Sequence, residues 1–161
     1  MNVTNGQVMR GFAKGEFEVR VARAQILMGQ HNIDALFLTT EPEIRYFTGY
    51  LTRFWESPSR PWFLILPQSG NPIAVIPSIG AALMAKTWIS DIRTWSSPDL
   101  SDDGITLLAE TLSEVLGAKA RIGVPSGHET HLRMPLSDFD RLKPLVPGLK
   151  FTDDFDIIRS L

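Results

Sequence analysis

The sequence predicts an α/β fold, a three-layer sandwich in which a mixed sheet of about five to six strands carries helices on both faces. Two observations support this prediction. Short apolar runs alternate along the chain with longer segments in which apolar residues recur every three or four positions. The first such run, residues 35–39, is nearly continuous, as expected of a strand that is covered on both faces.

The N-terminal part of the chain supplies a helix and a helical turn on either side of that strand. Residues 1–15 are polar and predict a flexible arm. The helix over residues 16–31 is predicted by apolar residues at three- and four-residue steps: Phe17, Val21, Ala24, Leu27 and Met28. Residues 43–50 predict a helical turn that ends at Gly49, because glycine adopts the left-handed cap conformation without strain.

An antiparallel hairpin is predicted in the middle of the chain. Two apolar runs, residues 62–66 and 73–76, flank a segment that is dense in turn-forming residues, 67–72. A short helix over residues 81–88 follows. Residues 92–95 then alternate between apolar and polar side chains, which predicts a strand.

The C-terminal part repeats the alternation of helices and strands. The predicted elements are a helix that ends at Leu116, a strand at 121–124, a helix from Pro135, a strand at 149–151 and a helix from about Phe155. The acid pairs Asp102-Asp103 and Asp153-Asp154 precede the first and the last of these helices, where capping is their expected role rather than metal binding or proton transfer. Residues 155–161 leave apolar side chains uncovered.

Composition and missing motifs exclude several classes of function. Cysteine is absent, which excludes disulfide scaffolds, thiol catalysis and thiolate metal sites. The net charge of −2 gives no reason to expect nucleic acid or a membrane as partner, and no apolar stretch approaches the roughly 18 residues of a membrane span. Phosphate-binding loops, dinucleotide fingerprints and nucleophile elbows are also missing. We expect a cytoplasmic protein.

One short segment has the residue types of a metal site. His128-Glu129-Thr130-His131 offers two imidazoles and a carboxylate within four residues. The segment lies between Gly127 and Pro135 in a predicted loop, which favours an ordinary polar loop. A small autonomous metalloenzyme that uses these side chains is the alternative.

The region from Arg45 to Phe63 holds seven of the fifteen aromatic residues, interleaved with three arginines. Tyr46, Phe47 and Phe63 are expected in the core. Four candidate contact residues lie in the loop between the helical turn and the second strand: Arg53, Phe54, Trp55 and Arg60. Arginine and large aromatics anchor interfaces and bind carboxylates, so these four predict either an interface or substrate contact, with plain surface as the open alternative.

The segment Ile44-Arg45-Tyr46-Phe47-Thr48-Gly49-Tyr50 resembles the "asn-ile-arg-tyr-leu-thr-gly-phe" segment of the creatinase/Xaa-Pro aminopeptidase/prolidase family, the pita-bread metallohydrolases. Glu43 and Phe47 replace the usual Asn and Leu. Three further segments resemble the family in the same order: Asp34–Leu38 (with Asn32 where Gly is usual), residues 121–124 (followed by Pro125 where Glu is frequent) and residues 151–161. The resemblance runs from residue 16 to residue 161.

The resemblance implies that residues 16–154 form the N-terminal domain of such an enzyme and that residues 155–161 begin the connection to a C-terminal catalytic domain. In the family, that second domain holds two divalent metal ions (Mn, Co or Zn), although creatinase-like members need none. No catalytic residue, metal ligand or cofactor is therefore expected in this chain.

The resemblance also implies a homodimer and a role in substrate gating, in which the loop at about residues 51–62 contacts substrate in a neighbouring active site. Arg60 resembles an arginine that holds a substrate carboxylate, and Phe54 and Trp55 would form walls of the pocket. The implied substrate is a small peptide or amide, among which Xaa-Pro dipeptides, longer peptides and creatine stay open. A stand-alone α/β ligand-binding or interaction module is the alternative function.

Overall fold

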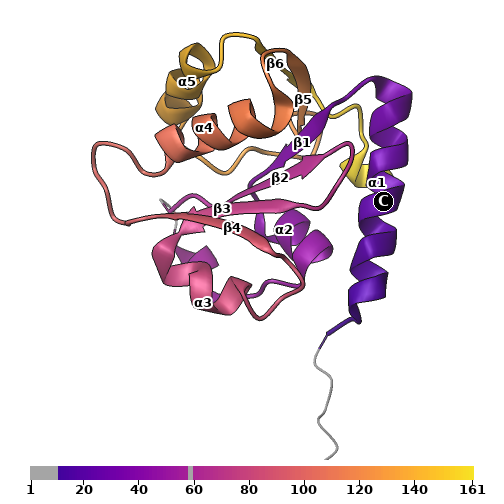
Figure 1. Cartoon of the computed structure of the whole chain (residues 1–161), viewed down its shortest axis with the longest axis horizontal. Helices are drawn as coiled ribbons and strands as arrows, with labels where there is room; N and C mark the ends of the chain where they lie inside the picture. Colours follow the sequence, from indigo (N-terminus) through magenta and orange to yellow (C-terminus); the bar gives the residue numbers. More distant parts are fainter. Residues whose placement is uncertain (1–10, 58–59) are drawn as a thin grey trace, which may run out of the picture.

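The computed structural model describes residues 11–57 and 60–161 (Figure 1). Its centre is a six-stranded sheet in the order β4-β3-β2-β1-β5-β6. The strands are β1 (Ala35–Leu38), β2 (Phe63–Pro67), β3 (Ile73–Pro77), β4 (Asp91–Trp95), β5 (Ala120–Val124) and β6 (Leu149–Asp153). β2 pairs antiparallel with β1 and with β3, which confirms the hairpin, and the other three pairings are parallel. The sheet is therefore mixed, as predicted.

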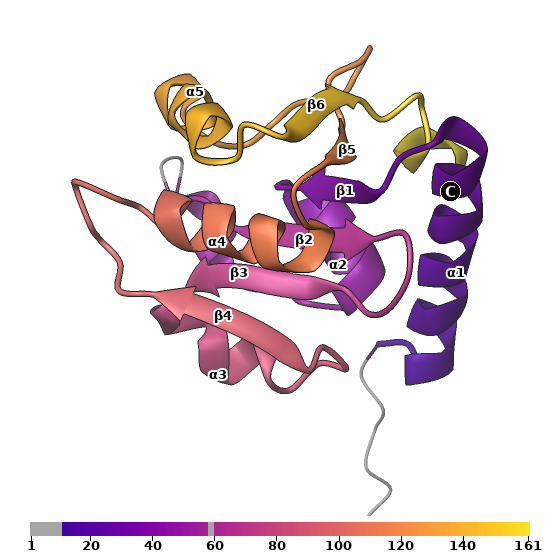
Figure 2. The same ribbon diagram turned by 45° about the horizontal axis from the view of Figure 1, so that its top comes forward.

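Five helices cover the two faces of this sheet. They are α1 (Lys14–His31), α2 (Glu41–Thr48), α3 (Ala81–Met84), α4 (Ile105–Leu116) and α5 (Leu136–Leu145). Figures 1 and 2 show α4 and α5 on one side of the sheet, and α1, α2 and α3 on the other. The predicted three-layer sandwich is confirmed.

The strands divide their side chains between two hydrophobic cores. Leu36, Leu38, Leu64 and Leu66 point into the core beneath α1, α2 and α3. Their neighbours Ala35, Phe37, Phe63 and Ile65 point into the core beneath α4 and α5. Because successive residues of a strand face opposite sides, a strand buried on both faces needs an almost continuous apolar run. This is why β1 and β2 are uniformly apolar.

One predicted helix is shorter in the structure, and a second ends at Leu116 as predicted. The helix expected over residues 81–88 ends at Met84, because the Thr87 hydroxyl donates to the Met84 carbonyl and accepts from the Ile89 backbone N–H, which closes a turn in place of another helical turn. α4 begins after Gly104, which has φ +88°, and the Asp102 carboxylate accepts from the backbone N–H groups of Ile105 and Thr106. The capping role expected of this acid pair is confirmed for Asp102.

The C-terminal segment departs most from expectation. A helix does not start at Phe155, because Phe155 and Asp156 take left-handed φ angles of +54° and +60°. A 3-10 turn follows instead at Ile158–Ser160, and the Asp154 carboxylate accepts from its first backbone N–H. Of the apolar residues expected to be uncovered, Phe155 is 42% exposed, whereas Ile157 is fully buried and Ile158 and Leu161 pack against the core beneath α1 and α2.

Candidate functional site

The loop that carries the four candidate residues joins α2 to β2 and starts at a sharp turn. α2 has a capping box of Thr40 and Glu43, and it ends at Gly49, which has φ +75°. A Cβ atom at Gly49 would lie 2.8 Å from the Phe17 ring, so both conformation and space require glycine there. The Thr52 hydroxyl then accepts from the Phe54 backbone N–H and starts a 3-10 turn, η1 (Arg53–Glu56).

The base of the loop is an aromatic cluster around Trp62, which is fully buried. The ring centroids of Tyr50, Phe54 and Trp55 lie 5.6, 6.3 and 5.6 Å from that of Trp62. Gly80 lies against this cluster, and a Cβ atom there would come within 2.8 Å of the Tyr50 hydroxyl oxygen. The aromatic side chains predicted to contact a partner therefore also hold the loop onto the core.

Arg133 clamps the loop from a distant part of the chain. Its guanidinium donates to three backbone carbonyls, those of Arg60 (2.7 Å), Ser57 and Trp55 (3.4 Å), and it stacks 5.2 Å from the centre of the Trp55 ring. Its own backbone N–H donates to the Thr39 hydroxyl. Desolvation lowers the pKa of Arg133, and the nearby Glu41 carboxylate opposes this shift. Arg133 thus fixes the path of the loop.

The structure separates the four predicted contact residues into two pairs. Arg53 and Trp55 line a hollow of about 520 Å³ together with Glu41, Leu51, Thr52 and Glu56. The Arg60 guanidinium instead lies 5.9 Å from the centre of the Phe54 ring, and neither residue lines this hollow. The hollow presents one guanidinium and two carboxylates, so it offers charges of both signs beside an aromatic wall.

Three buried donors of the cluster have no hydrogen-bond partner among the described residues: Tyr50 Oη, Trp55 Nε1 and Trp62 Nε1. Buried polar groups are normally paired, so three such groups around one loop are unusual. Burial raises the pKa of Tyr50 to about 12, and the nearby Thr52 side chain opposes this shift.

The three aromatic residues expected in the core are found there only in part. Phe47 and Phe63 are buried core residues, whereas Tyr46 is half-buried.

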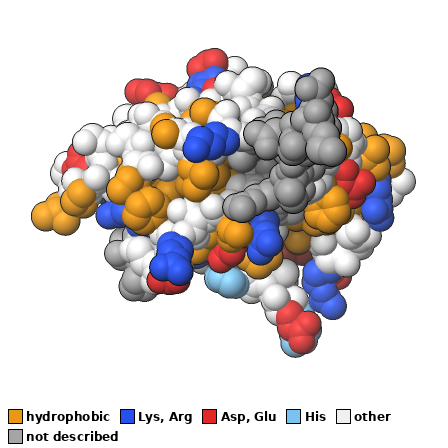
Figure 3. Space-filling view, turned by 90° about the horizontal axis from the view of Figure 1, so that it is seen from below, with side chains coloured by type: hydrophobic (Ala, Val, Ile, Leu, Met, Phe, Trp, Pro, Cys, Tyr) orange, Lys and Arg blue, Asp and Glu red, His pale blue; other side chains and the backbone are white. Residues whose placement is uncertain are grey.

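A larger hollow of about 950 Å³ lies between α1, α2 and α3 and meets the loop at Leu51. Arg20, Arg45 and Lys86 line it, among apolar side chains. Figure 3 shows hydrophobic side chains interspersed with Lys, Arg, Asp and Glu on the side of the molecule where α3 lies.

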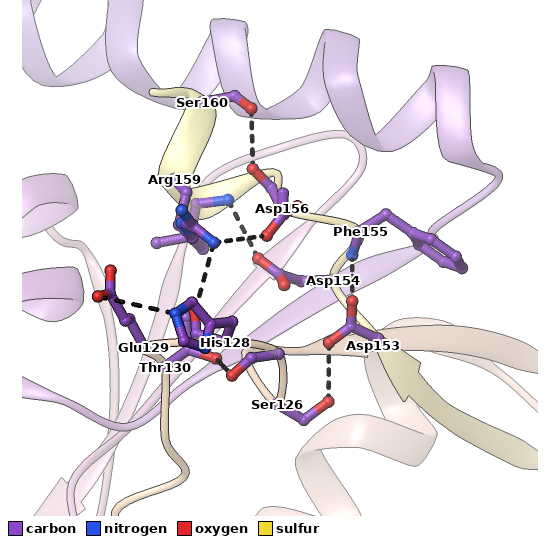
Figure 4. Close-up of polar contacts among 12 residues, drawn as sticks. Ser126, His128, Glu129, Thr130, Asp153, Asp154, Phe155, Asp156, Arg159 and Ser160 are labelled. Carbon is purple, nitrogen blue, oxygen red and sulfur yellow. Dashed lines mark hydrogen bonds and ion pairs between the residues drawn. The ribbon is translucent and has the colours of Figure 1, made fainter.

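The histidine segment forms an exposed loop after β5, as predicted (Figure 4). His128 Nε2 lies 3.8 Å from a Glu129 carboxylate oxygen, and both side chains are largely exposed. Nearby, the Asp153 carboxylate accepts from the Ser126 hydroxyl and the Phe155 backbone N–H. Within residues 11–57 and 60–161, no three His, Asp or Glu side chains gather as a metal site would require.

The match to a family model shows to which protein family the chain belongs. The model of the creatinase/prolidase N-terminal domain matches residues 20–161. The chain belongs to this family. The match includes the segment from Ile44 to Tyr50, the candidate loop and Arg133, so the resemblance seen in the sequence is confirmed.

Solved structures have the same fold as this member of the creatinase/prolidase N-terminal domain family. It is 25% identical to the dipeptidase PepE from Mycobacterium ulcerans, with a TM-score of 0.68 over 94% of this chain and 38% of that one. A prolidase from Thermococcus sibiricus is 16% identical, with a TM-score of 0.73 over 93% of this chain and 37% of that one.

A third similar structure is the creatinase/prolidase N-terminal domain of an X-Pro dipeptidase from Streptococcus pyogenes, 15% identical, with a TM-score of 0.65 over 89% of this chain and 98% of that one. The chain thus spans 38% and 37% of the length of the two longer proteins. Curated protein sequences give no significant match. Among the helices of the described residues, none is long and apolar enough to cross a membrane.

Proposed function

We propose that this chain serves a hydrolase of C–N bonds as its non-catalytic, substrate-gating domain, and that the substrate is an Xaa-Pro dipeptide or a similar small peptide or amide. Family membership and the names of the similar structures support this class of enzyme. Residues 16–154 would form the domain and residues 155–161 the start of the connection to a catalytic domain. The protein would act in the cytoplasm as a homodimer.

The clamped loop is the observation that carries the gating role. The free ends of a dipeptide carry an ammonium and a carboxylate, and the hollow beside η1 offers Glu41 and Glu56 for the first and Arg53 for the second. The Trp55 ring supplies the aromatic wall of the same hollow. Arg60, which stacks on Phe54, is proposed as the second carboxylate contact at the outer side of the loop.

The two divalent metal ions of this proposal would belong to the catalytic domain. The described residues of this chain bring no three potential ligands together, so they do not fit such a centre. The chain would contribute binding and orientation of the substrate, while bond cleavage would occur elsewhere.

The kinetics of the complete gene product test this proposal. Arg53→Ala and Arg60→Ala are expected to raise KM for Gly-Pro more than they lower kcat, because they remove contacts made to the bound substrate. Lys119→Ala, an exposed cation far along the chain from the loop, is the control and is expected to leave both constants unchanged.

Three outcomes would contradict the proposal. The first is hydrolysis of Gly-Pro by the 161-residue chain alone in the presence of Mn²⁺. The second is an unchanged KM in both arginine variants. The third is a stop codon directly after the codon for Leu161, which would favour the stand-alone binding module.

A further inference from the structure

The outer face of α1 carries a stripe of small and apolar residues that the described structure leaves uncovered except at Gly29, where a Cβ atom would lie 3.1 Å from Gln68 Nε2. Phe17, Val21, Ala24 and Met28 turn the inner face of the helix into the core. On the opposite face, Gly15, Val19, Ala22, Ile26 and Gly29 follow one another at steps of three and four residues, and all are exposed. We refer to these five residues as the α1 stripe.

The exposure of the stripe is unusual for a helix that faces only water. Val19 and Ile26 are 57% and 63% exposed. By comparison, the outer positions of α4 are polar, with Thr106, Glu110 and Ser113 at similar spacing. A helix that is apolar on two opposite sides is normally buried on both. Figures 1 and 2 show α1 along one side of the molecule, where a partner has access to this face.

We propose that the α1 stripe packs against the same stripe of a second copy of this chain, with the two helices antiparallel. The proposal deepens the assembly role in the proposed function by naming its surface and register. A pair of copies related by a twofold axis uses the same patch twice, so the patch must be complementary to itself.

The order of large and small residues in the stripe satisfies this condition. Large residues (Val19, Ile26) alternate with small ones (Gly15, Ala22, Gly29). With the twofold axis between residues 20 and 21, Val19 faces the partner's Ala22, and Ile26 faces the partner's Gly15. Each large side chain then fills the space left by a small one, and the helix axes approach closely between residues 15 and 26. A parallel pair would instead place large on large and glycine on glycine.

The charges beside the stripe fit the same register. Glu16 and Arg23 lie on one flank of the stripe, seven residues apart, and Arg23 is exposed. In the antiparallel pair Arg23 lies beside the partner's Glu16, and the twofold axis makes this contact twice. The Glu16 side chain also accepts from Arg20 at 3.0 Å but remains 48% exposed, so it is accessible to both cations.

The absence of cysteine from the sequence allows a direct test of the register by oxidation of engineered single-cysteine variants. Gly15→Cys and Ile26→Cys place thiols at opposite ends of the stripe, and a Cβ atom at Gly15 meets no other atom within 4 Å. The antiparallel register brings residue 15 of one copy next to residue 26 of the other. A disulfide requires Cα atoms within about 7 Å, so we expect a cross-linked dimer only when the two variants are mixed. Cross-linking of either variant by itself would overturn the register. The absence of a cross-linked dimer from the mixture would overturn it as well.

Sedimentation velocity of further variants tests whether the α1 stripe is the surface through which the chain dimerises. The unmodified chain is expected to be a dimer and Val19→Glu a monomer, while Leu136→Glu, at a 75% exposed position on α5, stays dimeric. Circular dichroism checks that each variant is folded. A dimeric Val19→Glu would refute the α1 stripe but leave the assembly role intact, whereas a monomeric unmodified chain would refute both.

Discussion

Two loops of this domain contain residue types that are typical of binding or catalytic sites, and the two differ in how firmly the rest of the structure holds them. The loop from Leu51 to Arg60 packs its aromatic rings on the buried Trp62 and is clamped by Arg133. The histidine segment, residues 126–131, begins the loop that also carries Arg133, but it is itself largely exposed. Within the described structure its polar groups contact each other and the C-terminal residues Asp153 and Arg159 (Figure 4). Side chains that must hold a substrate need a rigid support. The comparison therefore favours the first loop as the functional one, although the second resembles a metal site more closely in sequence.

Removing the base of the first loop should have the largest effect. Trp62→Ala deletes a fully buried side chain that contacts three other aromatic rings. We expect the free energy of unfolding to fall by about 3–5 kcal/mol, measured by urea denaturation. A loss below about 1 kcal/mol would show that the cluster does not support the loop.

Releasing the clamp should have the next largest effect. Arg133→Met keeps the aliphatic length but removes all three hydrogen bonds to the loop carbonyls. We expect a loss of about 2–3 kcal/mol in unfolding free energy and faster amide exchange at residues 53–57, measured by hydrogen–deuterium exchange. The matched control is Arg141→Met on α5. Its cation pairs with Asp138 at 3.6 Å on the surface, so the change should affect stability little. Equal effects of the two variants would contradict the clamp.

Alkaline pH should weaken the first loop through Tyr50. Its pKa is raised to about 12 in the folded protein by burial, against about 10 for an exposed tyrosine. The unfolded chain thus releases the proton first, so this contribution to stability is complete below pH 10 and is lost as the pH rises towards 12, by about 1.4 kcal/mol per pH unit. Tyr50→Phe should flatten that part of the stability curve. An unchanged slope would mean that Tyr50 is not desolvated.

Changes in the histidine segment, which makes none of the Arg133 contacts, should have the smallest effect. His128→Ala and His131→Ala replace exposed side chains, and we expect unfolding free energies within about 0.5 kcal/mol of the original. Addition of Zn²⁺ should leave the Tm unchanged, because a bound metal would stabilise the folded state. A zinc-dependent rise in Tm that disappears in His128→Ala would instead support the autonomous metalloenzyme.

Local patterns in the sequence were sufficient for most of the fold. Three kinds of pattern depend only on residues close together in the chain: the continuous apolar runs at β1 and β2, the helical spacing at α1, and the turn residues between β2 and β3. The structure confirms each of these predictions. The turn at residues 155–160 was predicted as a helix, because left-handed φ angles at Phe155 and Asp156 leave no mark in the spacing of apolar residues.

The candidate site was predictable only in part. The aromatic and arginine content of residues 53–60 identified the loop, but the division into an Arg53–Trp55 pair and a Phe54–Arg60 pair depends on packing. Arg133 was missed, because it lies 73 or more residues from the carbonyls that it binds. An isolated arginine in a loop carries no local signal of such a contact.

The indole N–H signals of the four tryptophans test the central claim most directly. Trp88 and Trp95 donate to the Phe47 carbonyl and the Asp103 carboxylate, whereas Trp55 Nε1 and Trp62 Nε1 have no acceptor among the described residues. Titration with Gly-Pro, followed by proton–nitrogen NMR, should shift the Trp55 signal most and leave Trp88 and Trp95 in place. Four unmoved signals, or a shift confined to Trp88 and Trp95, would contradict the assignment of the Arg53–Arg60 loop as the site of substrate contact.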